Sequence, residues 1–187
     1  ITRKVVLGKP WVFSFVFLMV MAFLGGVTSA TPTIIIGWGL AYAICEQCGF
    51  KKGDSYPLIL IFGTAFIAQM GDCIIPFKSI PLLVMGVYEG LAGAPIPLAS
   101  YMLIVIVAIV LSAIAYLFIA KMLFKPDMSS LKNLDAQTLI GKDGIQMNKQ
   151  QKVVLLFLIL LMVMMLLPGF FPNSTLLPIV FLKKIGS

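Results

Sequence analysis

Long apolar runs dominate the pattern along this chain, and short segments rich in polar residues, glycine or proline separate them. Runs of roughly 20 apolar residues suit helices that cross a bilayer, where every backbone polar group must be bonded within its segment. We therefore predict an all-α, polytopic membrane protein. The predicted segments are a basic lead-in (1–9), a helical hairpin (10–50), a discontinuous transmembrane helix (55–95), a transmembrane helix (99–124), a cytoplasmic polar loop (125–152), and a further transmembrane helix with the start of a truncated second half (153–187).

The two arms of the predicted hairpin, residues 10–27 and 33–50, are divided by a small, hydroxyl-rich and uncharged break. Within it, Thr31 suits a helix N-cap and Pro32 suits the first position of the next helix. Irregular backbone at membrane depth is tolerated only where it is buried in protein or lines a polar cavity. Helix N-termini at such breaks offer N–H donors and partial positive charge to anionic substrates. The break at residues 29–32 therefore indicates an anion transporter rather than a plain membrane anchor.

Basic residues cluster before the first run, after the second run and around the polar loop, whereas residues 88–98 contain Glu89 and no Lys or Arg. Because cytoplasmic loops carry an excess of Lys and Arg, we predict that the basic segments are cytoplasmic and that Glu89 lies outside. From Lys52 to Glu89 the chain must then cross an odd number of times. One discontinuous helix, broken near Gly71 and Asp72, meets this requirement in a multi-pass protein of the cell membrane. Length alone leaves open whether the hairpin spans fully or is re-entrant.

Composition supports the membrane prediction, because 60% of the residues are hydrophobic, 11% are charged and the mean hydropathy is +1.07. The net charge of +7 lies mainly in short segments between apolar runs, which argues against a nucleic-acid-binding stripe. The chain has no His and no base accompanies Ser29, so we expect no enzymatic activity and no hydrolase. Cys45 and Cys48 form a Cys-x-x-Cys, but no second pair completes a metal site. We interpret them as small membrane-helix residues rather than a redox pair or half a zinc site.

Asp72 and Lys78 are ionisable residues within the predicted discontinuous helix. Such residues cost about 2.5–3.5 kcal/mol on insertion scales and are usually functional. Asp72 can bind sodium or accept a coupling proton; alternatively it caps the broken helix or pairs with Lys78. Lys78 can hold a substrate carboxylate, stand in for a sodium ion, or extend its ammonium group to the membrane interface.

A hairpin with a polar tip, followed by a broken helix, resembles the divalent anion:sodium symporter family, which comprises dicarboxylate, citrate and sulfate carriers of the ion transporter superfamily. That family carries Ser-Asn-Thr at the tip of a re-entrant hairpin. The corresponding place here reads Ser29-Ala30-Thr31-Pro32-Thr33, preceded by Ala22-Phe23-Leu24. Residues 63–71 resemble the family's next helix, which ends at an unwound glycine. The resemblance covers roughly residues 10–124 together with the connection and span that follow. The second Ser-Asn-Thr of the family is absent from this sequence, and we expect a fragment of a longer protein.

The resemblance implies part of an inverted-repeat secondary transporter of small anions, di- or tricarboxylates, that is coupled to sodium or protons and forms a homodimer. In the family, the hairpin tip binds a substrate carboxylate, and a sodium ion lies nearby against the broken helix. Ala30 replaces the family's Asn and Gly25 stands where a Ser can occur, so two side-chain oxygens of the sodium site are missing. The substrate-binding candidates are Ser29, Ala30, Thr31, Thr33 and Lys78. The sodium candidates are Gly25, Ser29, Gly71 and Asp72.

Two other functions stay open at the level of sequence. One is a membrane scaffold or subunit that transports nothing. The other is a transporter with a different cargo, either an inorganic anion carrier or a cation antiporter. A motionless scaffold has little need for a hydroxyl-rich break beside a charged broken helix, which favours the carrier.

Overall fold

The computed structural model describes residues 9–51, 53–128 and 148–150, together with residues 152, 153, 156, 157, 159, 160 and 163. In this part of the chain the structure delimits five helices and contains no strand, which confirms the all-α prediction. Most of the basic lead-in, of the polar loop and of the last predicted span lies outside the described residues. The five helices are α2 (Pro10–Val27), α3 (Ala30–Gln47), α4 (Ser55–Gly71), α5 (Ser79–Ala92) and α6 (Leu98–Phe124).

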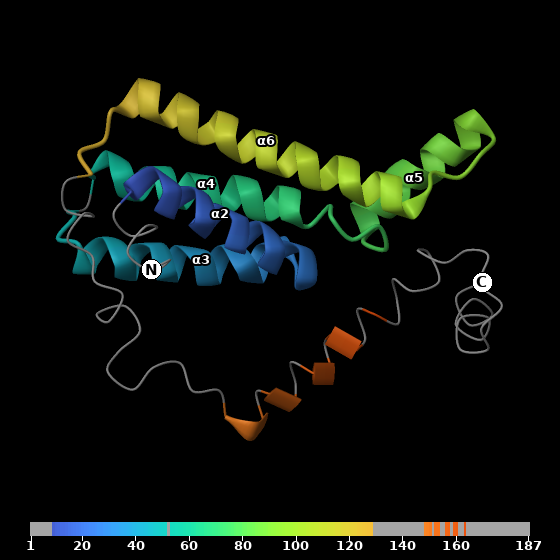
Figure 1. Cartoon of the computed structure of the whole chain (residues 1–187), viewed down its shortest axis with the longest axis horizontal. Helices are drawn as coiled ribbons and strands as arrows, with labels where there is room; N and C mark the ends of the chain where they lie inside the picture. Colours follow the sequence, from blue (N-terminus) through green and yellow to red (C-terminus); the bar gives the residue numbers. More distant parts are fainter. Residues whose placement is uncertain are drawn as a thin grey trace.

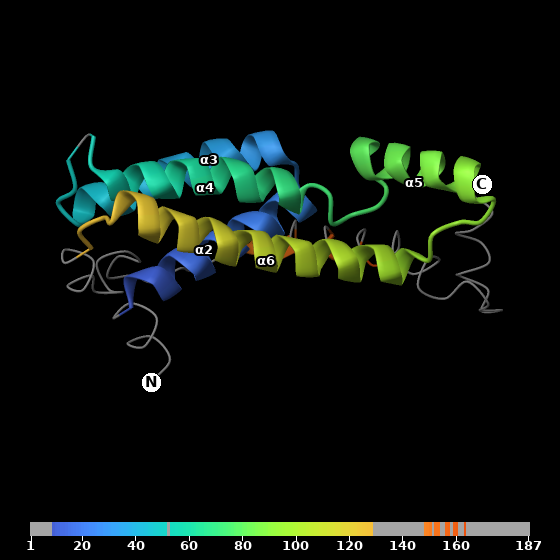
Figure 2. The same ribbon diagram turned by 90° about the horizontal axis from the view of Figure 1, so that it is seen from above.

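Four of these helices form a bundle, and α5 extends beyond it (Figure 1). α2 and α3 lie side by side as an antiparallel hairpin, and α4 packs against both of them. α6 lies along α2 and α4 and runs opposite to them, as the view from above also shows (Figure 2). The starts of α2 and α4 and the ends of α3 and α6 therefore share one end of the bundle. The hairpin tip and the connection from α4 to α5 lie toward the other end.

Small residues let α2 and α4 approach each other closely near their C-terminal ends. A Cβ atom added to Gly25 would lie 2.5 Å from the carbonyl oxygen of Ala68, and one added to Gly71 would lie 2.8 Å from the Cα of Ala22. Both distances are well below the 3.4 Å at which ordinary contact begins. Contacts between small residues are typical of helices packed in membranes, where close backbone approach replaces the hydrophobic effect between helices.

The centre of the bundle combines apolar packing with a few satisfied hydroxyl groups. Tyr56 and Ser14 are almost fully buried, and their hydroxyl oxygens lie 3.0 Å apart in a hydrogen bond between α4 and α2. Buried Thr64 donates to the Leu60 carbonyl of its own helix at 2.6 Å. In the described residues no buried side-chain polar atom lacks a partner, as expected where water is excluded. The large buried apolar side chains include Leu18, Met21, Leu60 and Ile67.

Large apolar side chains are exposed along α5 and α6. Leu91 on α5 is 85% exposed, and Leu103 and Phe118 on α6 are 65% and 62% exposed. Soluble monomers rarely expose contiguous apolar patches of such extent. By length and composition, α2 and α6 can each cross a membrane. The predicted transmembrane helix at residues 99–124 corresponds to α6.

The structure corrects two predicted helix boundaries. Thr31 is not the N-cap of the second arm: α3 begins at Ala30, and Ser29, with extended backbone (φ −167°, ψ 163°), occupies the N-cap position. Serine caps helices at least as well as threonine, and Pro32 still lies in the first turn, where its missing N–H is not needed. Gly71 is the last helical residue of α4 rather than an unwound residue. The irregular stretch is residues 72–78, within which Pro76 disfavours helical backbone at the residue before it.

Candidate functional site

The break between α4 and α5 is a short series of turns. The backbone N–H of Asp72, the C-cap of α4, donates to the Ala68 carbonyl at 3.0 Å, and Ile74 donates to the Gly71 carbonyl at 2.9 Å. The chain then turns through residues 75–77 to Lys78, the N-cap of α5. A non-helical stretch therefore separates α4 from α5 near the predicted break, with Asp72 at its start and Lys78 at its end. That the two helices form one discontinuous transmembrane span stays a prediction.

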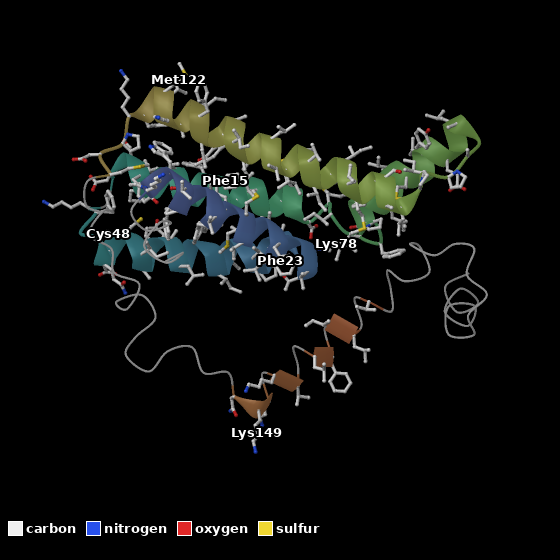
Figure 3. All side chains as sticks on the ribbon, in the orientation of Figure 1. Phe15, Phe23, Cys48, Lys78, Met122 and Lys149 are labelled. Atoms are coloured by element: carbon white, nitrogen blue, oxygen red, sulfur yellow. The ribbon has the colours of Figure 1, made fainter. Side chains whose placement is uncertain are left out.

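The Lys78 side chain joins this break to the end of α2. Its Nζ atom donates to a carboxylate oxygen of Asp72 at 2.7 Å and to the carbonyl oxygen of Gly25 at 2.7 Å. Figure 3 shows Lys78 beyond the end of α4, at the end of the bundle where the hairpin turns. The side chains of Lys78 and Asp72 are only 20% and 22% exposed. A lysine ammonium group thus occupies the space between a carboxylate and a helix C-terminus.

The hairpin tip has its own hydrogen bonds between hydroxyl groups. Thr28, the C-cap of α2, donates from its backbone N–H and from its hydroxyl to the Leu24 carbonyl, at 2.8 and 2.7 Å. The hydroxyl oxygens of Thr28 and buried Thr33 lie 3.0 Å apart. Ser29 and Thr31 are exposed, and the Ser29 side chain makes no capping hydrogen bond. Their hydroxyl groups therefore stand at the surface of the tip, beside the N-terminus of α3.

The structure brings three of the predicted site residues into contact, whereas others pack elsewhere in the bundle. Gly25, Asp72 and Lys78 meet directly through the ammonium group of Lys78. Gly71 contributes close backbone packing against Ala22. Ala30, like Thr33, is buried in the first turn of α3, behind the exposed hydroxyl groups of the tip. The roles assigned to these residues in substrate and sodium binding stay predictions.

Sequence reasoning missed two contributors to this region. Tyr101, near the start of α6, donates its hydroxyl to the Cys73 carbonyl at 2.9 Å and so connects α6 to the break. Thr28 links the end of α2 to α3 through Thr33. The contact of Tyr101 could have been anticipated in kind, because the hydroxyl of a buried tyrosine needs a hydrogen-bond partner and this tyrosine lies near the end of an apolar helix.

An apolar groove lies beside the site. Its volume is about 340 Å³, and it is bounded by the end of α2, the break and the first half of α6, with Gly26, Ile74 and Ile106 among its lining residues. Its lining offers no charge to an anion. The polar groups that can bind a charged ligand are instead those of the hairpin tip and of the Asp72–Lys78 pair.

Among the residues that the structure describes, the cysteines and other candidate metal ligands do not assemble into a second site. Cys45, Cys48 and Cys73 are free thiols. In the described part of the chain no three His, Cys, Asp or Glu side chains are placed to hold a metal ion. Cys45 lies in the last turn of α3 and Cys48 is its C-cap, and their interpretation as small membrane-helix residues stays a prediction.

Comparison of the sequence with known protein families, with curated proteins and with solved structures gives no match. The resemblance to the divalent anion:sodium symporters therefore rests on the motifs in the sequence. The function must be argued from the geometry of the two helix breaks and the charges around them.

Proposed function

We propose that this chain is part of a secondary active transporter of small anions, di- or tricarboxylates, coupled to sodium or protons. The observation that carries the proposal is the packing of two helix breaks against each other in an apolar bundle. One break is the hairpin tip between α2 and α3, and the other is the connection from α4 to α5. The Lys78 ammonium group joins them at 2.7 Å from the Gly25 carbonyl.

Paired helix breaks are costly in a membrane, which argues for a function at this place. Each break leaves backbone N–H and C=O groups that lipid cannot satisfy. Transporters use discontinuous helices of this kind to hold substrates near the bilayer midplane, with helix N-termini directed at anionic groups. A scaffold with the same fold gains nothing from such breaks and would be more stable with continuous helices.

The distribution of charge supports a defined orientation in the membrane. Lys9, Lys51, Lys121 and Lys125 lie at the end of the bundle where α2 starts and where α3 and α6 end. Glu89 lies on α5, which extends from the opposite end. We propose that the basic end is cytoplasmic, in keeping with the positive-inside rule.

The length of α6 favours a re-entrant hairpin. Its 27 residues extend about 40 Å, enough to cross a hydrocarbon core of roughly 30 Å, whereas each arm of the hairpin has 18 residues, about 27 Å. In both views the hairpin tip stops short of the N-terminal end of α6 (Figures 1 and 2). We propose that α6 crosses the membrane and that the tip, about 27 Å from the basic end, stops within the far part of the bilayer core rather than beyond it.

The hairpin tip has the chemistry that a carboxylate requires. The first N–H groups of α3 have no partner within the helix, and the helix N-terminus carries roughly half a positive charge. The exposed hydroxyl groups of Ser29 and Thr31 add two donors at the same place. A bound carboxylate accepts charge-assisted hydrogen bonds from these groups, which are stronger than neutral ones.

Uptake by the full-length protein in proteoliposomes tests the site. We expect the double variant Ser29→Ala and Thr31→Val to lose uptake of radiolabelled succinate while its expression and folding stay unchanged. A hydrogen bond to a charged group contributes about 1.5–3 kcal/mol, so each hydroxyl is worth roughly 10–100-fold in binding.

A matched control removes hydroxyl groups elsewhere. The double variant Ser100→Ala and Ser112→Ala changes two serines of α6 outside the hairpin and should transport like the wild type. Undiminished uptake by the Ser29 and Thr31 variant would refute the substrate site.

A further inference from the structure

We infer that the Lys78 ammonium group is a built-in cation: it fills the position between the Gly25 carbonyl and the Asp72 carboxylate, so that no sodium ion binds there. The inference starts from an unusual set of contacts. Lys78 reaches across 53 positions of sequence to Gly25 and across six positions to Asp72, at 2.7 Å in each case. One nitrogen atom therefore connects the end of α2, the end of α4 and the start of α5.

The Gly25 carbonyl is one of those that a helix leaves unbonded at its C-terminus. The last four carbonyl groups of an α-helix lack an intrahelical partner, and α2 ends at Val27. The Leu24 carbonyl is satisfied by the backbone N–H and the hydroxyl of Thr28. The Gly25 carbonyl, directed toward the break, accepts from Lys78 instead.

The electrostatics of this position select a cation. A helix C-terminus carries roughly half a negative charge, and the Asp72 carboxylate adds a full one. Carbonyl and carboxylate oxygens at a broken helix are the groups with which transporters coordinate Na⁺. A sodium ion would have to displace a covalently attached ammonium group, and binding there would bring two positive charges together.

The partial burial of the pair makes it more than a surface contact. Both side chains are about four-fifths buried, so water screens their attraction less than at an exposed surface. Lys78 is the N-cap of α5 and directly follows the turns of the break, so its backbone has a defined position there. The contact fixes the end of α2 against the break.

For coupling, the inference rests on the proposed transport function and deepens it. If the chain carries anions, its transport does not depend on a sodium ion at this position. Removal of the ammonium group leaves the Gly25 carbonyl and the Asp72 carboxylate facing an uncompensated space, which a free Na⁺ can then occupy.

Thermal unfolding of the purified full-length protein tests the inference without any transport assay. The melting temperature is measured in sodium chloride and in choline chloride of equal concentration. We expect the wild type to melt at the same temperature in both salts. We expect Lys78→Met to melt at a lower temperature than the wild type in choline. In sodium its melting temperature should rise by roughly 3–6 °C for each tenfold increase of the sodium concentration above the Kd of the variant for sodium.

Three further variants make the result specific. Lys78→Met combined with Asp72→Asn should lose the sodium response, because the carboxylate ligand is gone. Lys78→Gln, whose amide can still donate to the Gly25 carbonyl but carries no charge, provides a second test if Lys78→Met does not fold. Lys121→Met removes an exposed lysine at the other end of the bundle and should show no sodium response.

The contradicting outcomes are equally defined. Stabilisation of the wild type by sodium over choline that Asp72→Asn abolishes while Lys78 is retained overturns the inference, because sodium then binds beside the ammonium group. So does a Lys78 variant that is destabilised equally in both salts, which would make the lysine a structural contact only. Failure to take up either succinate or citrate would refute the proposed function and leave this result unaffected.

Discussion

A methyl group added at Gly71 should separate α2 from α4 and destabilise the protein. Gly71 is the last residue of α4, and a Cβ atom there would lie 2.8 Å from both the Cα and the carbonyl carbon of Ala22 on α2. Ordinary contact begins at 3.4 Å and the carbonyl oxygen of Ala22 lies closer still, so the two backbones must move apart by more than about 0.6 Å. The neighbouring atoms belong to helical backbone and cannot rotate away as a flexible side chain can.

The expected cost follows from two opposing terms. Overpacking of a well-packed interior costs about 1–3 kcal/mol. Replacing glycine by alanine within a helix contributes up to about 1 kcal/mol in the other direction. We therefore expect Gly71→Ala to be less stable, by about 2 kcal/mol, than a Gly→Ala variant at a helical position with open space. For a chain of this size this corresponds to a melting temperature lower by roughly 4–8 °C.

Gly39→Ala supplies the matched control. Gly39 lies within α3, and a Cβ atom there would meet nothing within 4 Å. The melting temperatures of the wild type and both variants are compared for the purified full-length protein in one detergent. If Gly71→Ala is as stable as Gly39→Ala, the close crossing of α2 and α4 is wrong.

The remaining predictions concern a buried hydrogen bond and the orientation of the chain. Ser14 donates its hydroxyl to the Pro10 carbonyl at 3.0 Å, so the Tyr56 hydroxyl is the donor in their 3.0 Å contact. Tyr56→Phe should then lower the free energy of unfolding by only about 0.5–1.5 kcal/mol. Ser14→Ala leaves the buried Tyr56 hydroxyl without its acceptor and should lower it by about 1–3 kcal/mol. The reverse order of stability in thermal unfolding would contradict this assignment. For orientation, single cysteines at Lys51 and Glu89, in a protein whose natural cysteines are replaced, should react with a membrane-impermeant maleimide from opposite sides of the membrane. Labelling of both from one side would exclude the proposed topology.

Hydropathy and helix-boundary signals predicted the helices well, because each is encoded locally. Pro10 lies at the start of α2, and the apolar run ends where α6 ends at Phe124. The break in the third run was also predictable, since Gly71 and Asp72 interrupt its apolar pattern. The exact start of α3 was not, because Ser29 and Thr31 are both good N-caps and local signals cannot rank them.

The contacts of the site were much less predictable than its elements. Lys78 and Asp72 could be recognised as costly charges in an apolar segment, and their pairing was one of several alternatives. The partner at Gly25 is a backbone carbonyl 53 positions away, and no side-chain pattern reports it. The contact of Tyr101 with the Cys73 carbonyl has the same origin. Both depend on how α2, α4 and α6 pack, which a single sequence does not specify.

The most direct test of the proposed function is the accumulation of a labelled dicarboxylate by the wild-type protein. Proteoliposomes containing the full-length protein are compared with protein-free liposomes for time-dependent uptake of radiolabelled succinate and citrate, under an imposed sodium gradient and under an imposed pH gradient. The proposed function predicts saturable uptake of at least one of these anions above the protein-free level. Uptake indistinguishable from that of protein-free liposomes under both gradients, by protein shown to be folded, would contradict it and favour a membrane scaffold.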